Sequence, residues 1–158
     1  MIEAVPESTA EEEATHGFLH FYFGHKLIEL VVSTNDAECR CRFSIPDVET
    51  PDFLLERTVT ACAGRRFKTE TEWLGSKDYR GALECALKLS GNDDEATGLL
   101  LKWATRCADV INEKHRAQVS RLTYELLCQE RLTGDEVAKI IERVTPGAIK
   151  VEPLPVAA

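Results

Sequence analysis

Apolar residues that recur every three or four positions through most of this chain restrict it to a mainly helical fold. Each such stretch can bury one face of a helix, and the polar or glycine-containing segments between stretches mark the helix ends. The longer predicted helices cover about 10–23, 52–67, 77–89, 95–112 and 114–130. A shorter helix that ends at Val144 follows the last of these, because Thr133 and Glu136 have the spacing of a capping box.

One segment departs from the helical pattern. Residues 26–32 form a run rich in β-branched side chains, and after Asn35 and Asp36 the polar and apolar side chains of 37–43 alternate. This pattern predicts an antiparallel β-hairpin. The expected fold class is therefore mainly α (α+β), a helical bundle with a small antiparallel hairpin or sheet.

The length of 158 residues fits one domain. We expect a folded region over 9–145, a disordered N-terminus over 1–8, and a flexible tail over 146–158, where Pro146 ends the last helix.

The charge of the chain argues against a nucleic-acid partner. Nineteen Lys and Arg stand against 27 Asp and Glu, for a formal net charge of −8, and the basic residues are scattered along the sequence. Phosphate binding requires clustered cations. The chain also has no apolar run of roughly 18 residues, which a membrane-spanning helix requires, and its acidic start is unlike a signal peptide. We therefore expect a cytoplasmic protein with no membrane partner.

The six cysteines are expected to be reduced. Cys39 and Cys41 are close enough in sequence for a metal or redox role.

Candidate metal ligands recur along one stripe of the first predicted helix. Glu12, His16 and His20 are four residues apart, with Glu13 beside them, so that carboxylate and imidazole groups could converge on one ion. The alternative is an ordinary solvated face, because charged residues at this spacing are common on helix surfaces.

The segment from Glu12 through Val32 resembles the H-E-x-x-H helix and following strand of FtsH-type zinc peptidases. His16 matches the second histidine of the motif, Gly24 matches a recurrent glycine after the helix, and residues 27–32 match the edge strand. In this register Glu13 takes the position of the general-base glutamate. Glu12 stands where the first zinc-binding histidine belongs, and a threonine, Thr15, replaces a small residue.

Three further stretches resemble the same family in the same order, so that the resemblance runs from about 9 to 144. The sequence at 61–66 resembles a helix that ends in Ala-Gly, with Lys68 where an acidic residue is common. The sequence at 75–83 resembles the segment that supplies the third metal ligand, which maps to Asp78, and 127–137 resembles the closing signature. The resemblance implies that the helix starting near Asp78 packs beside the helix carrying His16. Alternatively, Asp78 serves only as a helix cap or first-turn acid.

In such peptidases two histidines and a carboxylate hold Zn²⁺, and a glutamate accepts a proton from the attacking water. The resemblance therefore implies His16, Asp78 and possible ligand Glu12 around the metal, with Glu13 as base. A carboxylate at Glu12 adds negative charge and favours harder cations, so Zn²⁺ is expected to bind weakly or not at all. In an alternative register His16 pairs with His20, and the position of the base falls on a glycine.

These observations lead to three functional hypotheses. The first is an FtsH-like pseudopeptidase that binds a protein or peptide, and the second is a stand-alone zinc metallopeptidase. The third is a helical interaction protein unrelated to peptidases. The chain has no G-x-x-x-x-G-K-[ST] motif, so any ATPase partner is expected to be a separate protein.

Overall fold

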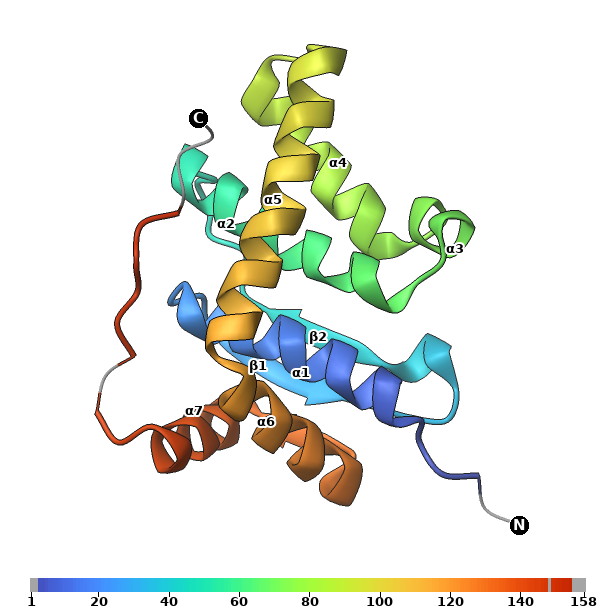
Figure 1. Ribbon diagram of the computed structural model, residues 1–158, viewed down its shortest axis with the longest axis vertical. Coiled ribbons are helices and arrows are strands. Elements are labelled where there is room, and N and C mark those ends of the chain that lie inside the picture. Colours follow the sequence, from blue (N-terminus) through green and yellow to red (C-terminus); the bar gives the residue numbers. More distant parts are fainter. Residues whose placement is uncertain (1–2, 148, 155–158) are drawn as a thin grey trace. The chain divides into compact units, whose positions relative to one another are not determined.

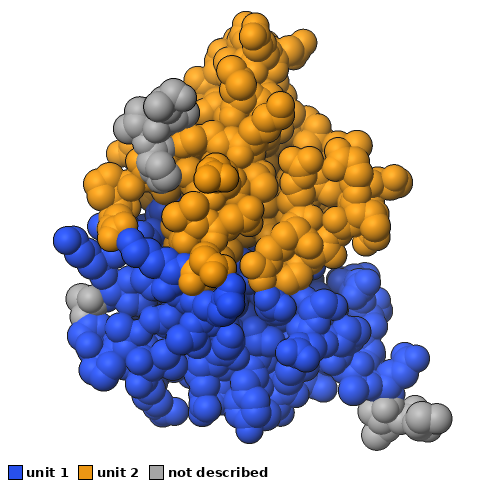
Figure 2. Space-filling model, viewed as in Figure 1, with its two compact units in different colours: residues 1–44, 114–151 blue, residues 45–113, 152–158 orange. Residues whose placement is uncertain are grey.

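The computed structural model describes residues 3–147 and 149–154 and confirms the mainly helical fold class with a small antiparallel sheet (Figure 1). The chain divides into two compact units, which Figure 2 distinguishes by colour. Unit 1 comprises residues 1–44 and 114–151, and unit 2 comprises residues 45–113 and 152–158. Each unit has its own arrangement of helices and is described separately.

Unit 1 packs its helices against a three-stranded sheet. Helix α1 packs against α6 and against β1, while α7 packs against α6 and the two strands β1 and β3. These contacts join the first 44 residues to a segment that begins 70 positions later, at residue 114, so unit 1 forms only after the chain returns to it. Its elements are α1 (Glu7–Tyr22), β1 (Leu27–Val31), the 3₁₀ turn η1 (Asp36–Glu38), β2 (Arg40–Phe43), α6 (Arg116–Gln129), β3 (Arg131–Thr133) and α7 (Gly134–Val144).

The sheet has the strand order β2-β1-β3, and both pairings are antiparallel. The predicted hairpin is confirmed over β1 and β2, except that Ala37 and Glu38 belong to η1 instead of the second strand. The expectation that β1 is an edge strand is wrong. Strand β3 pairs with its second side, with Leu132 opposite Leu30, and this leaves β2 and β3 as the two edges.

The ends of unit 1 differ from the sequence prediction in one respect. Helix α1 begins at Glu7, within the segment 1–8 that was expected to be disordered, because the backbone N–H groups of Thr9 and Ala10 donate to the carbonyl of Pro6. Residues 1–2 lie outside the described part of the chain. In the predicted tail, 149–154 carry no helix or strand, and 148 and 155–158 lie outside the described residues.

A glycine sets the distance between α1 and the sheet. A Cβ atom built on Gly17 would lie 2.5 Å from Cδ1 of Leu30, which is fully buried on β1. Leu30 and Leu132 therefore face α1, and the alternation of side chains along a strand directs Glu29 to the opposite face of the sheet.

Unit 2 consists of helices joined by short connections. Helix α2 packs against α4, which also contacts the short helix α3, and the Cys62 thiol lies 3.8 Å from the carbonyl of Leu101 on α5. Helix α3 is absent from the sequence prediction. Its Trp73 is buried edge-to-face against Tyr79, with ring centroids 5.6 Å apart, so this indole serves packing. The elements are α2 (Pro51–Cys62), the 3₁₀ turn η2 (Ala63–Phe67), α3 (Glu70–Leu74), α4 (Lys77–Ser90) and α5 (Asp94–Lys114).

None of the six cysteines forms a disulfide, and Cys62, Cys85 and Cys107 are buried. Burial raises the pKa of the Cys62 and Cys107 thiols to about 11, which keeps them protonated at neutral pH. Among the described helices, none combines the length and apolar character needed to cross a bilayer.

Candidate metal centre

Helix α1 places Glu12 and His16 one turn apart, as the sequence predicts. Nε2 of the largely buried His16 lies 4.0 Å from Oε1 of Glu12. Two ligands of a tetrahedral zinc ion stand roughly 3.3 Å apart, given bonds of about 2 Å. A small side-chain rotation would therefore allow both atoms to bind one metal ion. Without a metal ion, the two groups form a weak ion pair when His16 is protonated.

Glu13 follows on the same helix, toward the connection between β1 and β2. Burial raises the pKa of the Cys39 thiol, and the negative charges of Glu13, Asp36 and Glu12 raise it further. These carboxylates therefore act on one small region of unit 1. Cys39 itself is held by Ser33, whose backbone N–H donates to its sulfur at 3.2 Å. This hydrogen bond lowers the pKa of the thiol, but burial and the carboxylates outweigh it, and a protonated thiol is a poor metal ligand and a poor nucleophile.

Thr15 fits the buried helix without disturbing it. The side chain is fully buried, and its hydroxyl donates to the carbonyl of Glu11 at 2.7 Å. This hydrogen bond within the helix satisfies the hydroxyl, so a threonine is acceptable where the peptidase family has a smaller residue. The close approach to the sheet occurs instead two residues later, at Gly17.

His20 interacts with His25, which the alternative register did not anticipate. The two Nδ1 atoms are 3.0 Å apart, so one imidazole donates and the other accepts, and the His20 ring stacks on Phe43 with centroids 3.9 Å apart. His25 is therefore part of the packing between the end of α1 and β2. Its isolated position in the sequence gives no sign of this contact.

This histidine pair predicts a loss of stability in acid. Burial lowers the pKa of His25 from 6.5 to about 4, so between these pH values the unfolded chain takes up a proton that the folded protein excludes. Stability should be unaffected by His25 above pH 6.5 and should fall as the pH falls toward 4. At about 1.4 kcal/mol per pH unit the full shift would remove on the order of 2 kcal/mol by pH 5, and solvent screening of the partly exposed ring reduces this to roughly 1 kcal/mol.

Urea unfolding of the wild type and of His25→Gln at pH 7.5 and pH 5 measures this loss. The drop in unfolding free energy between the two pH values should be larger in the wild type by roughly 1 kcal/mol. Carboxylates titrate in both proteins and cancel in the comparison. An equal drop in the two proteins would contradict the assignment.

Asp78 belongs to unit 2 and lies in the first turn of α4. It is not the helix cap, because the Ser76 hydroxyl accepts the hydrogen bond from the Tyr79 backbone N–H at 3.0 Å. Nζ of Lys68 lies 3.9 Å from its Oδ2. A cation thus already neighbours the carboxylate expected to bind metal. The predicted approach of Asp78 to His16 would join the two units and stays a prediction.

No family model matches this chain, and no curated protein matches it either. The likeness to FtsH-type peptidases therefore depends on the residues quoted above. Its coarser consequence, a mainly helical fold with a small antiparallel sheet, is confirmed. Its finer consequences, the metal and the chemistry, are proposals.

Sequence reasoning missed two features around these residues. Lys68 departs from the family pattern in the sequence, and in the structure its Nζ lies 3.9 Å from Oδ2 of Asp78. The second is a buried carboxylate, Glu29, whose oxygens contact three arginines. A signal for it exists in the sequence, because a glutamate inside an apolar strand run requires a charged partner.

Proposed function

We propose that this protein is a cytoplasmic pseudopeptidase of FtsH-like type, which binds polypeptide and holds zinc weakly or not at all. The observation that carries the proposal is the pair of Glu12 and His16, with 4.0 Å between Oε1 and Nε2. A carboxylate in the first-ligand position replaces the second imidazole that zinc prefers, and it neutralises part of the charge of any bound cation.

The surroundings of Asp78 support the same conclusion. An ammonium group 3.9 Å from the carboxylate competes with a metal ion for it and repels the ion electrostatically. Glu12 in place of a histidine, and Lys68 beside Asp78, both weaken the binding of a metal ion.

Polypeptide binding requires a surface that does not depend on the metal. Within the described sheet, strand β2 has a neighbour on one side only, so its other side offers backbone groups to an extended peptide. This edge takes the place of β1, which the resemblance had matched to the edge strand of the family. We propose that a separate ATPase delivers unfolded segments to it.

A second candidate function is a weak zinc peptidase, which the position of Glu13 one residue after Glu12 favours. In that function Glu12, His16 and Asp78 would hold zinc, which supplies a Lewis acid. Glu13 would accept a proton from the attacking water, as a base adjacent to the ligands must. The geometry of Glu12 and His16 permits this function, because their ligand atoms need to move by less than about 1 Å.

Metal content, cleavage and binding separate the two candidates. Protein purified without chelator should contain far less than one zinc per chain, and it should bind labelled casein without cleaving it. Glu13→Gln should bind casein as the wild type does, because in a pseudopeptidase this carboxylate has no catalytic role. One tightly held zinc per chain, together with cleavage that Glu13→Gln abolishes, would establish the peptidase instead.

A further inference from the structure

A buried carboxylate on the central strand of unit 1 is surrounded by three arginines. The side chain of Glu29 is only 3% exposed. Its Oε1 accepts hydrogen bonds from Nε of Arg40 at 3.2 Å and from Nη1 of Arg42 at 2.9 Å, and its Oε2 lies 2.9 Å from Nη2 of Arg131. Charge-assisted contacts of this length are strong and geometrically specific.

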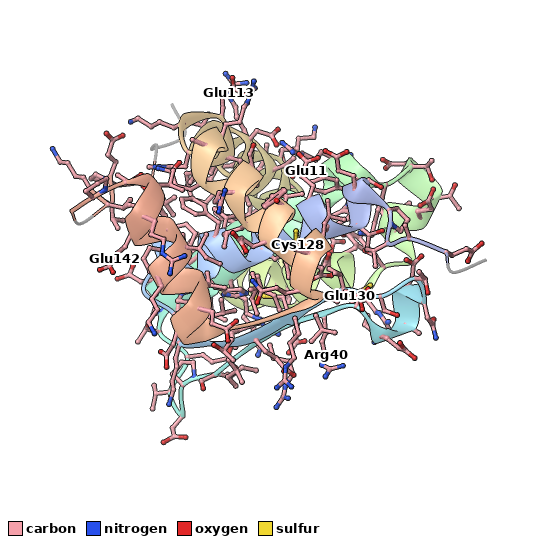
Figure 3. All side chains as sticks on the ribbon, turned by 90° about the horizontal axis from the view of Figure 1, so that it is seen from below. Glu11, Arg40, Glu113, Cys128, Glu130 and Glu142 are labelled. Carbon is pink, nitrogen blue, oxygen red and sulfur yellow. The ribbon has the colours of Figure 1, made fainter. Side chains whose placement is uncertain are left out.

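The strand register places the arginines on one face of the sheet. Arg42 and Thr133 lie on either side of Glu29, while Arg40 and Arg131 lie on either side of Val31. This face is opposite the one that Leu30 presents to α1. Figure 3 shows the Arg40 side chain pointing away from the sheet on the side opposite α1. We call this surface, formed by Glu29, Val31, Arg40, Arg42, Arg131 and Thr133, the arginine face.

The arginines carry more charge than Glu29 can neutralise. One guanidinium would balance one carboxylate, so three of them leave two positive charges in excess. The hydrogen bond from Arg42 contributes most to lowering the pKa of Glu29, followed by the other arginine contacts, which keeps the carboxylate charged. This excess stands out in a chain whose formal charge is −8.

The arginine heads are also accessible and already ordered. Arg40, Arg42 and Arg131 are 49%, 55% and 67% exposed, although each contacts Glu29. A guanidinium has several N–H donors, and each of these contacts uses one of them. Because Glu29 already restricts the side chains, an incoming anion loses less conformational entropy on binding them.

The cluster is costly for stability alone. Like charges that are close on one sheet face repel each other, and here Arg40 neighbours both Arg42 on its own strand and Arg131 across Val31. A bound anion would relieve that repulsion. The arrangement therefore fits a surface that is completed by a negatively charged partner.

We infer that the arginine face docks an acidic segment of a partner polypeptide, bound in an extended conformation along β2. Alternate side chains of an extended chain are about 7 Å apart on one side, the same spacing that separates Arg40 from Arg42. Two carboxylates two residues apart in the partner can therefore contact Arg40 and Arg42. Arg131, on β3, adds to the positive charge of the same face.

A polypeptide suits this surface better than a nucleic acid does. The face has three arginines and a net excess of two charges, whereas nucleic-acid affinity depends on many phosphate contacts. The strongly negative remainder of the chain would repel a long polyanion, but it affects a short acidic segment much less because salt screens charges beyond about 10 Å.

This inference rests on the proposed polypeptide binding and adds the chemistry of the partner. It does not depend on Glu12, His16 or any metal. Its test must therefore separate a preference for acidic segments from polypeptide binding in general.

The test uses fluorescence anisotropy of three labelled octapeptides, with Glu-Thr, Gln-Thr and Lys-Thr repeats, at low salt. We expect the Glu-Thr peptide to bind at least tenfold more tightly than the Gln-Thr peptide, and high salt to remove most of this difference. The triple variant Arg40→Gln, Arg42→Gln, Arg131→Gln should lose it as well. Arg121→Gln is the matched control, because Arg121 is an exposed arginine on α6 that pairs with Glu125.

Amide chemical shifts of the wild type provide a second readout that does not depend on the folding of the triple variant. The Glu-Thr peptide should shift signals of 39–43 and 131–133, and shifts confined to other regions would overturn the inference. Equal binding of Glu-Thr and Gln-Thr peptides would also overturn it while leaving the proposed function intact, whereas binding of no peptide would reject both. Stronger binding of oligothymidylate, or a dimer that the triple variant abolishes, would assign the face to nucleic acid or to a second copy.

Discussion

Glu12→His should raise the affinity for zinc at pH 7.5 by about a hundredfold, close to 3 kcal/mol. The variant restores two imidazoles one helical turn apart on α1, where Oε1 of Glu12 now lies 4.0 Å from Nε2 of His16. It also removes a carboxylate that favours harder cations, so the preference for Zn²⁺ over Mn²⁺ should increase. Calorimetric titration with each metal measures both effects.

The control for this variant is Glu11→His, which adds an imidazole to the same helix at a spacing that cannot pair with His16. It should leave the zinc affinity near that of the wild type. Equal affinities for the two histidine variants would contradict the metal centre on α1.

The same background tests the third ligand. If Asp78 binds the ion, adding Asp78→Asn to Glu12→His should weaken zinc binding, and adding Lys68→Ala should strengthen it by removing the competing ammonium group. If neither change alters the zinc affinity, the site on α1 has only two ligands, and the predicted convergence of Asp78 and His16 is rejected.

Gly134→Ala should destabilise unit 1 by about 3 kcal/mol or more. A Cβ on Gly134 would lie 2.0 Å from the carbonyl oxygen of Leu27 and 2.9 Å from its carbonyl carbon. Backbone atoms cannot rotate away as a side chain can. Relief therefore requires separating the start of α7 from β1, which would also weaken the pairing of β1 with β3.

Two other glycines provide the comparison. Gly17→Ala should cost less, because the atoms in its way are the methyl groups of Leu30. Gly98→Ala, at an exposed position in α5 with no heavy atom within 4 Å of the new Cβ, should be neutral or stabilise by up to about 1 kcal/mol. Urea unfolding with amide exchange in unit 1 measures the series. A Gly134→Ala protein as stable as the wild type would contradict this account.

Local patterns in the sequence predicted most helices and part of the candidate site. The spacing of Glu12 and His16 set their distance as soon as the helix was identified, since residues four apart share one face. Thr133 caps α7 as its motif indicates, accepting from the Glu136 backbone N–H at 3.2 Å. These features depend on residues within a few positions of one another.

Long-range contacts decided the rest. The pairing of β3 with β1 makes β1 a central strand and brings Arg131 to Glu29, although they are about a hundred residues apart in the chain. A three-residue strand such as β3 has too little periodicity to be recognised in the sequence. The sequence by itself determined the helices and the ligand spacing on α1, while only the tertiary structure assembled the arginine face, because strand pairing and burial depend on the packing of the whole unit.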